Sequence, residues 1–334
     1  LGAAEAFRQR AGIITDPAPR AAARGWPILL SSGWSATGNL GAMHTASPPR
    51  YDLGGCTVTL VNGGRLRLDG GAMFGLIPKP LWSRACPADE QNRIPLHCNC
   101  LLVEWPGPSE RRAIIETGHG PKYGDKEQRI FAIDPAHWLL PALVDLGVDP
   151  DTITDVIVSH LHFDHAGGLT YERNGEVRPT FPRARVHVQR AELDDARANF
   201  GIMTATYREE NYAALERAGA WRPLEGAGEI VPGIQARPTP GHTRGHHSIV
   251  VAGRDRRLVF AGDLMPTRHH LGAPYNMAYD LFPLENRASK QALLAWLAAD
   301  HGLLVLDHEV ETPVLTVCRK DDWFELQPEA GAAR

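Results

Sequence analysis

The sequence predicts an α+β fold in which two β-sheets pack together with helices on their outer faces. Short apolar runs bounded by turn residues are typical of buried strands, and they outnumber the segments with helical periodicity. The 334 residues include 33 glycines and 26 prolines, a share above the usual ~12% that favours many turns over a helical bundle. This mixture indicates two sheets rather than one doubly wound sheet.

Strands are expected wherever a short apolar run is bounded by turn residues. These runs cover residues 57–61, 101–105, 113–115, 156–158, 186–188, 249–252, 258–261 and 303–306. Helical periodicity covers residues 134–146, 190–199, 207–218 and 285–299. The first helix carries boundary signals, because Asp134 can cap its start, Pro135 suits its first turn and Gly147 can end it.

Residues 1–50 differ from the rest of the chain, since they are rich in Ala, Arg, Gly, Ser and Pro and lack sustained periodicity. We predict a disordered N-terminal extension over residues 1–50 and a single folded domain over residues 51–334. A secreted or processed leader is the alternative. Its closest candidate, residues 26–30, is short and is interrupted by Pro27.

Composition excludes several classes of protein. The net charge of −4 offers no basic footprint for nucleic acid, and no run approaches the ~18 apolar residues of a membrane span. Five cysteines are too few, and odd in number, for a disulfide framework. We therefore expect a cytoplasmic protein that binds neither nucleic acid nor membrane, with a secreted or periplasmic location as the alternative.

The most specific local pattern follows the apolar run 156–158, where four metal-ligand types occur within six residues. His160 and His162 stand two positions apart in an extended segment and can reach one ion. Asp164 and His165 fall on the following turn and can face a second ion. Such spacing favours a metal site over a structural histidine cluster.

Three other apolar runs are each followed by a further candidate ligand, namely His242, Asp263 and His308. Strands that end at one edge of a sandwich would bring these side chains together. Seven ligands suit two ions, so one carboxylate must bridge, and Asp263 is the candidate. Imidazole and carboxylate ligands favour zinc, with iron, manganese or cobalt as alternatives. Two such ions ~3.5–4 Å apart can share a hydroxide and polarise a substrate oxygen.

The His-x-His-x-Asp-His run, with the later Gly-His, Gly-Asp and single histidine in that order, resembles the metallo-β-lactamase fold superfamily over about residues 51–320. The resemblance implies an αββα sandwich with the metal site at the edge of the two sheets. The implied ligands are His160, His162 and His242 for one ion, Asp164, His165 and His308 for the other, and Asp263 for both.

Three segments are similar to N-acyl homoserine lactonases and their organophosphate-hydrolysing relatives. They are Phe163 within the metal motif, residues 241–248 and residues 69–75. An aspartate at position 263 is also similar to the hydrolase branches rather than to the antibiotic-degrading ones. The resemblance therefore implies quorum-quenching lactonase chemistry.

The chain departs from those lactonases in two places. They often carry a tyrosine soon after the bridging aspartate, whereas here only the more distant Tyr275 and Tyr279 can substitute. Glu116 stands where the superfamily commonly has aspartate, and we expect it in a supporting role. We expect His246 to orient a ligand by hydrogen bonding, with a purely structural role as the alternative.

Several aromatic and flexible apolar residues can form the wall of a substrate pocket, with core packing as the alternative. The proposed wall residues are Met73, Phe74, Phe200, Met203 and Tyr207. His269 and His270 have no ligand counterpart in the family, so surface positions are expected for both.

These observations predict a dinuclear hydrolase that opens lactones or related carboxylic esters, with Asp164 also passing a proton to the leaving alkoxide. A phosphotriester hydrolase and a glyoxalase II-like thioesterase share the ligand set and are the alternatives. A scaffold that retains the fold is the non-enzymatic alternative. The expected partner is a small-molecule substrate with an apolar portion, and the sequence also allows a homodimer.

Overall fold

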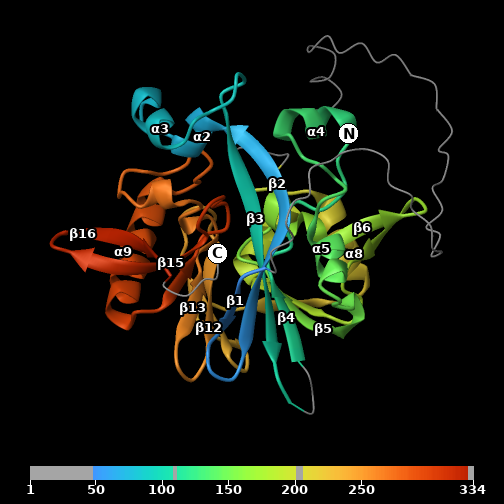
Figure 1. The fold of residues 1–334 in the computed structure, drawn as a ribbon. Coiled ribbons are helices and arrows are strands. Elements are labelled where there is room, and N and C mark those ends of the chain that lie inside the picture. Colours follow the sequence, from blue (N-terminus) through green and yellow to red (C-terminus); the bar gives the residue numbers. More distant parts are fainter. Residues whose placement is uncertain (1–47, 108–110, 201–205, 330–334) are drawn as a thin grey trace, which may run out of the picture. The chain divides into compact units, whose positions relative to one another are not determined.

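The computed structural model describes residues 48–107, 111–200 and 206–329. Most of the predicted N-terminal extension and the proposed wall residue Met203 lie outside these ranges. The described residues form two seven-stranded sheets and a separate two-stranded ribbon. The prediction of paired sheets with helices outside them is confirmed (Figure 1).

The first sheet consists, in spatial order, of β1 (Arg50–Asp52), β2 (Thr57–Asp69), β3 (Arg93–Trp105), β4 (Arg111–Ile115), β5 (Ile153–Ile157), β8 (Arg185–Gln189) and β9 (Trp221–Leu224). The second consists of β10 (Gly228–Val231), β11 (Ile234–Pro238), β12 (His247–Ala252), β13 (Arg257–Phe260), β14 (Leu303–Val305), β15 (Val314–Lys320) and β16 (Trp323–Pro328). The ribbon pairs β6 (Thr170–Arg173) with β7 (Glu176–Pro179). Parallel pairing links β4, β5, β8 and β9, and also β13 and β14.

The helices of the described chain are short except for the last. They are α2 (Gly70–Phe74), α3 (Lys79–Ala85), α4 (Asp125–Phe131), α5 (Leu139–Asp145), α6 (Phe163–Ala166), α7 (Arg190–Ala198), α8 (Ala213–Arg217) and α9 (Pro283–Asp300). Figure 1 shows α9 beside β15 and β16 on one side of the paired sheets, with α5 and α8 on the other side. None of the helices in the described residues is long and apolar enough to cross a membrane.

Three apolar layers hold this αββα sandwich together. Between the sheets, Leu101 of β3 belongs to the same buried cluster as Phe260 of β13. On the outer face of the first sheet, helices α5, α7 and α8 contribute to a cluster that includes Val156. On the outer face of the second sheet, Leu293 and Leu297 of α9 pack with strand residues. Removal of this apolar surface from water stabilises the layered arrangement.

Two predicted helices differ from the observed ones. The helix predicted from residue 134 begins at Leu139, because the Asp134 carboxylate accepts a hydrogen bond from the Ala136 amide and closes a separate turn. The helix predicted over residues 207–218 is divided into a 3₁₀ turn over Glu209–Asn211 and the short helix α8. At the first of these places a local side-chain hydrogen bond therefore overrides helical periodicity.

Helix α9 also anchors the long segment that follows β13. The Lys290 ammonium is buried and donates hydrogen bonds to the carbonyl oxygens of His270 at 2.9 Å, Gly272 at 3.1 Å and Tyr275 at 2.7 Å. Three acceptors satisfy the three N–H groups of this cation. They hold residues 270–275 against α9 and so set the path of the chain toward the site described below.

Candidate metal centre

All seven predicted metal ligands lie at one edge of the paired sheets, because each follows the end of a strand. His160 and His162 follow β5, and α6 then presents Asp164 and His165. The later ligands are His242 after β11, Asp263 in the 3₁₀ turn after β13, and His308 after β14. All seven side chains are buried.

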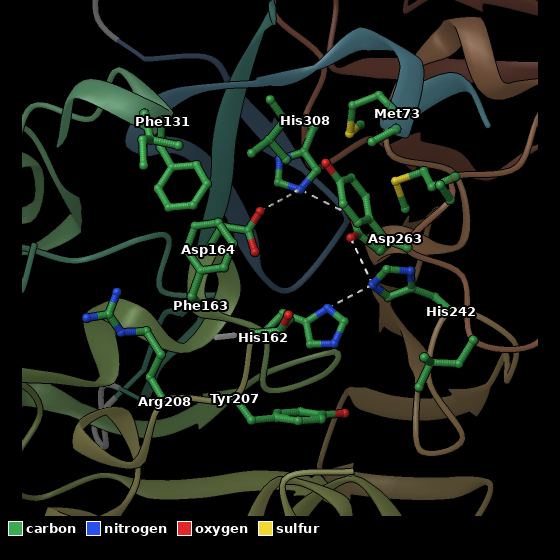
Figure 2. Close-up of a pocket in the computed structure, with 18 of the residues that line it drawn as sticks. Met73, Phe131, His162, Phe163, Asp164, Tyr207, Arg208, His242, Asp263 and His308 are labelled. Atoms are coloured by element: carbon green, nitrogen blue, oxygen red, sulfur yellow. Dashed lines mark hydrogen bonds and ion pairs between the residues drawn. The ribbon is translucent and has the colours of Figure 1, made fainter. Parts of the chain in front are cut away.

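The first group of ligand atoms comes from His160, His162, His242 and Asp263, which all lie within 4.8 Å of one another. The His242 Nε2 atom is 2.9 Å from His162 Nδ1 and 3.1 Å from Asp263 Oδ2. Figure 2 shows these three side chains converging. Four ligands at ~2.1 Å from one ion in a tetrahedron are themselves ~3.4 Å apart, so the spacing suits one ion.

The second group of ligand atoms within 4.8 Å of one another comes from His165, Asp263, Asp307 and His308. The predicted ligand Asp164 is not a member of this group, but it lies against both of its histidines. The His308 Nε2 atom is 3.2 Å from Asp263 Oδ1 and 3.6 Å from Asp164 Oδ2. The His165 Nε2 atom is 3.6 Å from Asp263 Oδ2 and 3.8 Å from Asp164 Oδ1. Asp263 thus contributes to both groups, as a bridging carboxylate would.

Several polar atoms at the centre lack hydrogen-bond partners in the part of the chain that the structure describes. The Nε2 atoms of His160, His165 and His308 and the Oδ1 atom of Asp263 are buried without a hydrogen bond. Burying such atoms unpaired is costly, and a divalent cation would satisfy them together. The donor set therefore fits two divalent ions.

Electrostatics agree with this use of His160, His162 and Asp263, whereas in His165, His242 and His308 the nearby carboxylates outweigh burial and raise the pKa. Burial lowers the pKa of His160 and of His162 well below its ordinary value, so both imidazoles stay neutral, as metal ligands must. Burial alone would raise the pKa of Asp263, but His165, His242 and His308 hold it well below its ordinary value. Asp263 is therefore an ionised carboxylate.

Carboxylates behind the ligands orient two of the histidines. The Nδ1 atom of His242 lies 2.9 Å from Asp280 Oδ1. The Nδ1 atom of His165 lies 2.9 Å from Asp307 Oδ2 and 3.3 Å from Glu116 Oε2. Such contacts turn the opposite ring nitrogen toward the metal position.

Glu116, expected in a supporting role, therefore lies against the ring of His165. Its other oxygen accepts a hydrogen bond from the Ser159 amide at 2.6 Å, at the start of the ligand loop. Its φ of 64° is unusual for a residue other than glycine. A strained backbone conformation of this kind persists where contacts with the surrounding structure hold it in place.

Two of the orienting carboxylates, Asp280 and Asp307, were not singled out by the sequence interpretation. Asp307 directly precedes the ligand His308, and this adjacency is the signal that could have found it. Asp280 lies 38 positions from His242 and has no such signal. His246 does not contact a ligand nitrogen closely. Its Nδ1 atom pairs with Thr239, and its ring centre is 5.4 Å from that of His160.

Five of the candidate metal ligands border a cavity of about 760 Å³ whose walls are mostly apolar. His162, Asp164, His242, Asp263 and His308 line one part of it (Figure 2). The apolar lining residues are Leu68, Ala72, Met73, Ile130, Phe131, Phe163, Phe200, Met277, Ala278 and Leu281. The cavity also contacts Tyr207, so three proposed wall residues, Met73, Phe200 and Tyr207, lie where expected.

Phe74, also proposed as a wall residue, belongs to the core instead. Its side chain is fully buried and stacks on Trp82 and on His270, with ring centres 5.2 and 4.9 Å away. The surface position expected for His270 is likewise wrong. That ring is buried because Nε2 donates to the Met73 carbonyl at 2.8 Å and Nδ1 contacts the Thr267 hydroxyl at 2.8 Å.

The two candidate tyrosines occupy different environments. Tyr279 lines the cavity beside Asp164 and Asp263, whereas Tyr275 packs edge-on against Phe74. Burial, then the charge of Asp69 and of these two carboxylates, raises the pKa of Tyr279, so its hydroxyl keeps its proton. Among the described residues this hydroxyl makes no hydrogen bond, whereas that of Tyr207 donates to Glu192. Tyr279 thus offers the cavity a free donor.

In a comparison with known protein families, residues 93–308 match the family described as "Metallo-beta-lactamase superfamily". An N-acyl homoserine lactonase of Bacillus cereus is 34% identical over 122 residues, which cover 36% of this chain and 42% of that protein. The chain thus spans less than half the length of this curated relative. A "probable metallo-hydrolase" of Mycobacterium tuberculosis is 26% identical over 266 residues, and this match covers 70% of this chain and 77% of that protein.

Solved structures share the same fold. A "probable metal-dependent hydrolase from Staphylococcus aureus" superposes with a TM-score of 0.75 at 27% identity, covering 84% of this chain and 99% of that one. AidC, described as a dizinc quorum-quenching lactonase in complex with its product, gives a TM-score of 0.69 at 18% identity. That match covers 84% of this chain and 97% of AidC, and it supports the fold alone.

Proposed function

The chain belongs to the metallo-beta-lactamase superfamily of metal-dependent hydrolases, and within it we propose that the protein opens lactones or related carboxylic esters at a dinuclear metal centre. The main support is that the ligand set forms part of the lining of an apolar cavity. A substrate held by those walls would lie directly against the metal positions. The homoserine lactonases that the chain resembles support the same substrate class.

Each group at the site has a different role in hydrolysis. Two divalent ions, when bound, supply a nucleophile from water at neutral pH and polarise the ester carbonyl. Asp263, whose oxygens lie against histidines of both groups, would hold both ions. Asp164 lines the cavity and is placed to pass a proton to the leaving alkoxide. The Tyr279 hydroxyl donates a hydrogen bond to the substrate oxygen that gains charge.

Charge in the cavity favours an uncharged substrate. Arg208 lines the wall, but its guanidinium is committed to Glu210 at 2.7 Å and to Glu127 at 2.8 Å. Its remaining nitrogen donates to the Lys122 carbonyl at 3.3 Å. A glutathione thioester carries two carboxylates and would need free cations. With Arg208 committed, Lys126 is the one lining cation without an ion pair among the described residues, and a single cation for two carboxylates favours a lactone over the thioester alternative.

A substrate screen tests the proposal. The purified protein is expected to contain two divalent ions per chain by elemental analysis and to open lactones with the highest kcat/KM in a pH-indicator assay. Aryl esters, phosphotriesters and glutathione thioesters form the comparison set. Faster turnover of a thioester or phosphotriester would assign the protein to that alternative. A metal-free protein without hydrolytic activity would favour the scaffold interpretation.

Replacing Tyr279 with phenylalanine is expected to lower kcat about 10- to 100-fold with a smaller change in KM. The variant loses a donor that acts on charge developing in the transition state, while the ring and its packing remain. Steady-state kinetics on the preferred ester measure the effect. Tyr275→Phe is the matched control, since Tyr275 is not among the cavity-lining residues. Equal kcat values for both variants would contradict a role for the Tyr279 hydroxyl.

A further inference from the structure

Glu192 is a fully buried carboxylate that is neither a metal ligand nor part of the cavity wall. It lies in the first turn of α7, and each of its oxygens is hydrogen-bonded. Oε1 accepts from the Leu161 amide at 3.0 Å and from the Tyr207 hydroxyl at 2.9 Å, while Oε2 accepts from the Thr243 hydroxyl at 2.6 Å. A buried carboxylate is stable only with such hydrogen-bond partners.

Two of these partners belong to the loops that carry the first metal group. Leu161 stands between the ligands His160 and His162, and Thr243 directly follows His242. One side chain is therefore bonded to both loops that supply the three histidines. These loops are about 80 residues apart in sequence, since His242 and His162 are separated by that number. A backbone hydrogen bond from the His247 amide to the Ser159 carbonyl at 3.2 Å also links the two loops.

Close packing adds to the hydrogen bonds. A Cβ atom on Gly245 would lie within 2.3–2.6 Å of the backbone and Cβ of Glu192, so only glycine lets the His242 loop approach α7. On the next turn of α7, Asp195 pairs with Arg244 of the same loop. The loop is thus held against α7 by packing, an ion pair and the Glu192 carboxylate.

We propose that Glu192 is a positioning residue that sets the geometry, and so the affinity, of the metal position formed by His160, His162 and His242. This inference rests on the proposed dinuclear function. The histidines of the other group are oriented differently. His165 faces Asp307 and Glu116, and the Nδ1 atom of His308 lies 2.7 Å from the His97 carbonyl. Loss of Glu192 should therefore weaken one metal position selectively.

Metal titration of the full-length apoprotein, with zinc and a competing chromophoric chelator, tests this selectivity. In Glu192→Leu, one of the two dissociation constants is expected to rise about 10- to 100-fold, the range for loss of a partner behind a ligand. The other should change less than about threefold. The weakened step should be the one that disappears in His242→Ala, not the one that disappears in His308→Ala.

Two further variants separate positioning from charge and from general stability. Glu192→Gln should retain near-wild-type affinity, because its amide oxygen can accept from Leu161 and Tyr207 while its NH₂ donates to the Thr243 hydroxyl. Tyr207→Phe loses one bond to Glu192 but neither loop contact, so both dissociation constants should be retained. If Glu192→Leu fails to fold, Thr243→Val removes a single loop contact and should weaken the same step.

The outcomes distinguish this inference from the proposed function. Two unchanged dissociation constants in Glu192→Leu, or in Thr243→Val where the first variant does not fold, would overturn the positioning role. Equal weakening of both steps would also overturn it, because it would indicate a general structural effect. A wild-type protein that binds two ions but hydrolyses no lactone or ester would overturn the proposed function and leave the comparison of metal affinities intact.

Discussion

Asp263→Ala is expected to lower kcat/KM for the preferred ester by at least about 1000-fold. Its two oxygens reach both ligand groups, since Oδ2 lies 3.1 Å from His242 Nε2 and 3.6 Å from His165 Nε2, while Oδ1 lies 3.2 Å from His308 Nε2. Removing the side chain takes a ligand from both metal positions and also the group that couples them. Because both the nucleophile and the polarisation of the carbonyl depend on the ions, neither function survives alone.

Elemental analysis of the same variant should show fewer than two ions per chain. His160→Ala is the matched comparison, since its Nε2 atom faces only the first group, and it should weaken mainly one position. Both variants should remain folded by circular dichroism, because the three apolar layers do not depend on metal. One tightly held ion in the wild type, retained in Asp263→Ala, would contradict the dinuclear proposal.

Lengthening the acyl chain of a lactone by four carbons is expected to raise kcat/KM by roughly two orders of magnitude. Each methylene buried against an apolar wall contributes ~0.8 kcal/mol, and the cavity of about 760 Å³ has room for such a chain. The wall includes Phe131 and Phe163, whose rings stack with centres 5.1 Å apart. Initial rates over a series of acyl chain lengths measure the slope.

Wall and core variants make this test specific. Phe131→Ala removes part of the cavity lining and should flatten the chain-length slope. Phe74→Leu is the control, because Phe74 packs between Trp82 and His270 outside the cavity. It should reduce thermal stability, as loss of buried core atoms does, while the slope is retained. A flat series in the wild type would place the substrate's apolar portion elsewhere.

The candidate metal ligands could be identified in the sequence because their signal is local. Each lies within a few positions of the end of an apolar run, and His160, His162, Asp164 and His165 share one short segment. The residue that follows a strand lies at the edge of the sheet where that strand ends. Pattern and residue type together were therefore sufficient to identify a layered α+β fold and a candidate metal centre.

Errors arose where the environment of a side chain depends on distant residues. Phe74 and His270 stack on each other although nearly 200 positions separate them. Neither a phenylalanine after a glycine-rich turn nor a histidine pair in a polar segment indicates such a contact. Hydrophobicity reports that a side chain prefers burial, but it does not distinguish a core from the wall of a cavity.

The sequence alone was enough to indicate which residue types meet at the metal centre, since ligand chemistry and strand ends are encoded over short distances. Packing in three dimensions was needed to select Tyr279 rather than Tyr275 as the free donor and to bring Asp280 to His242. It was equally needed to bond Glu192 to two loops at once. These relations depend on hydrogen bonds and close contacts between segments far apart in the chain, and no local periodicity records them.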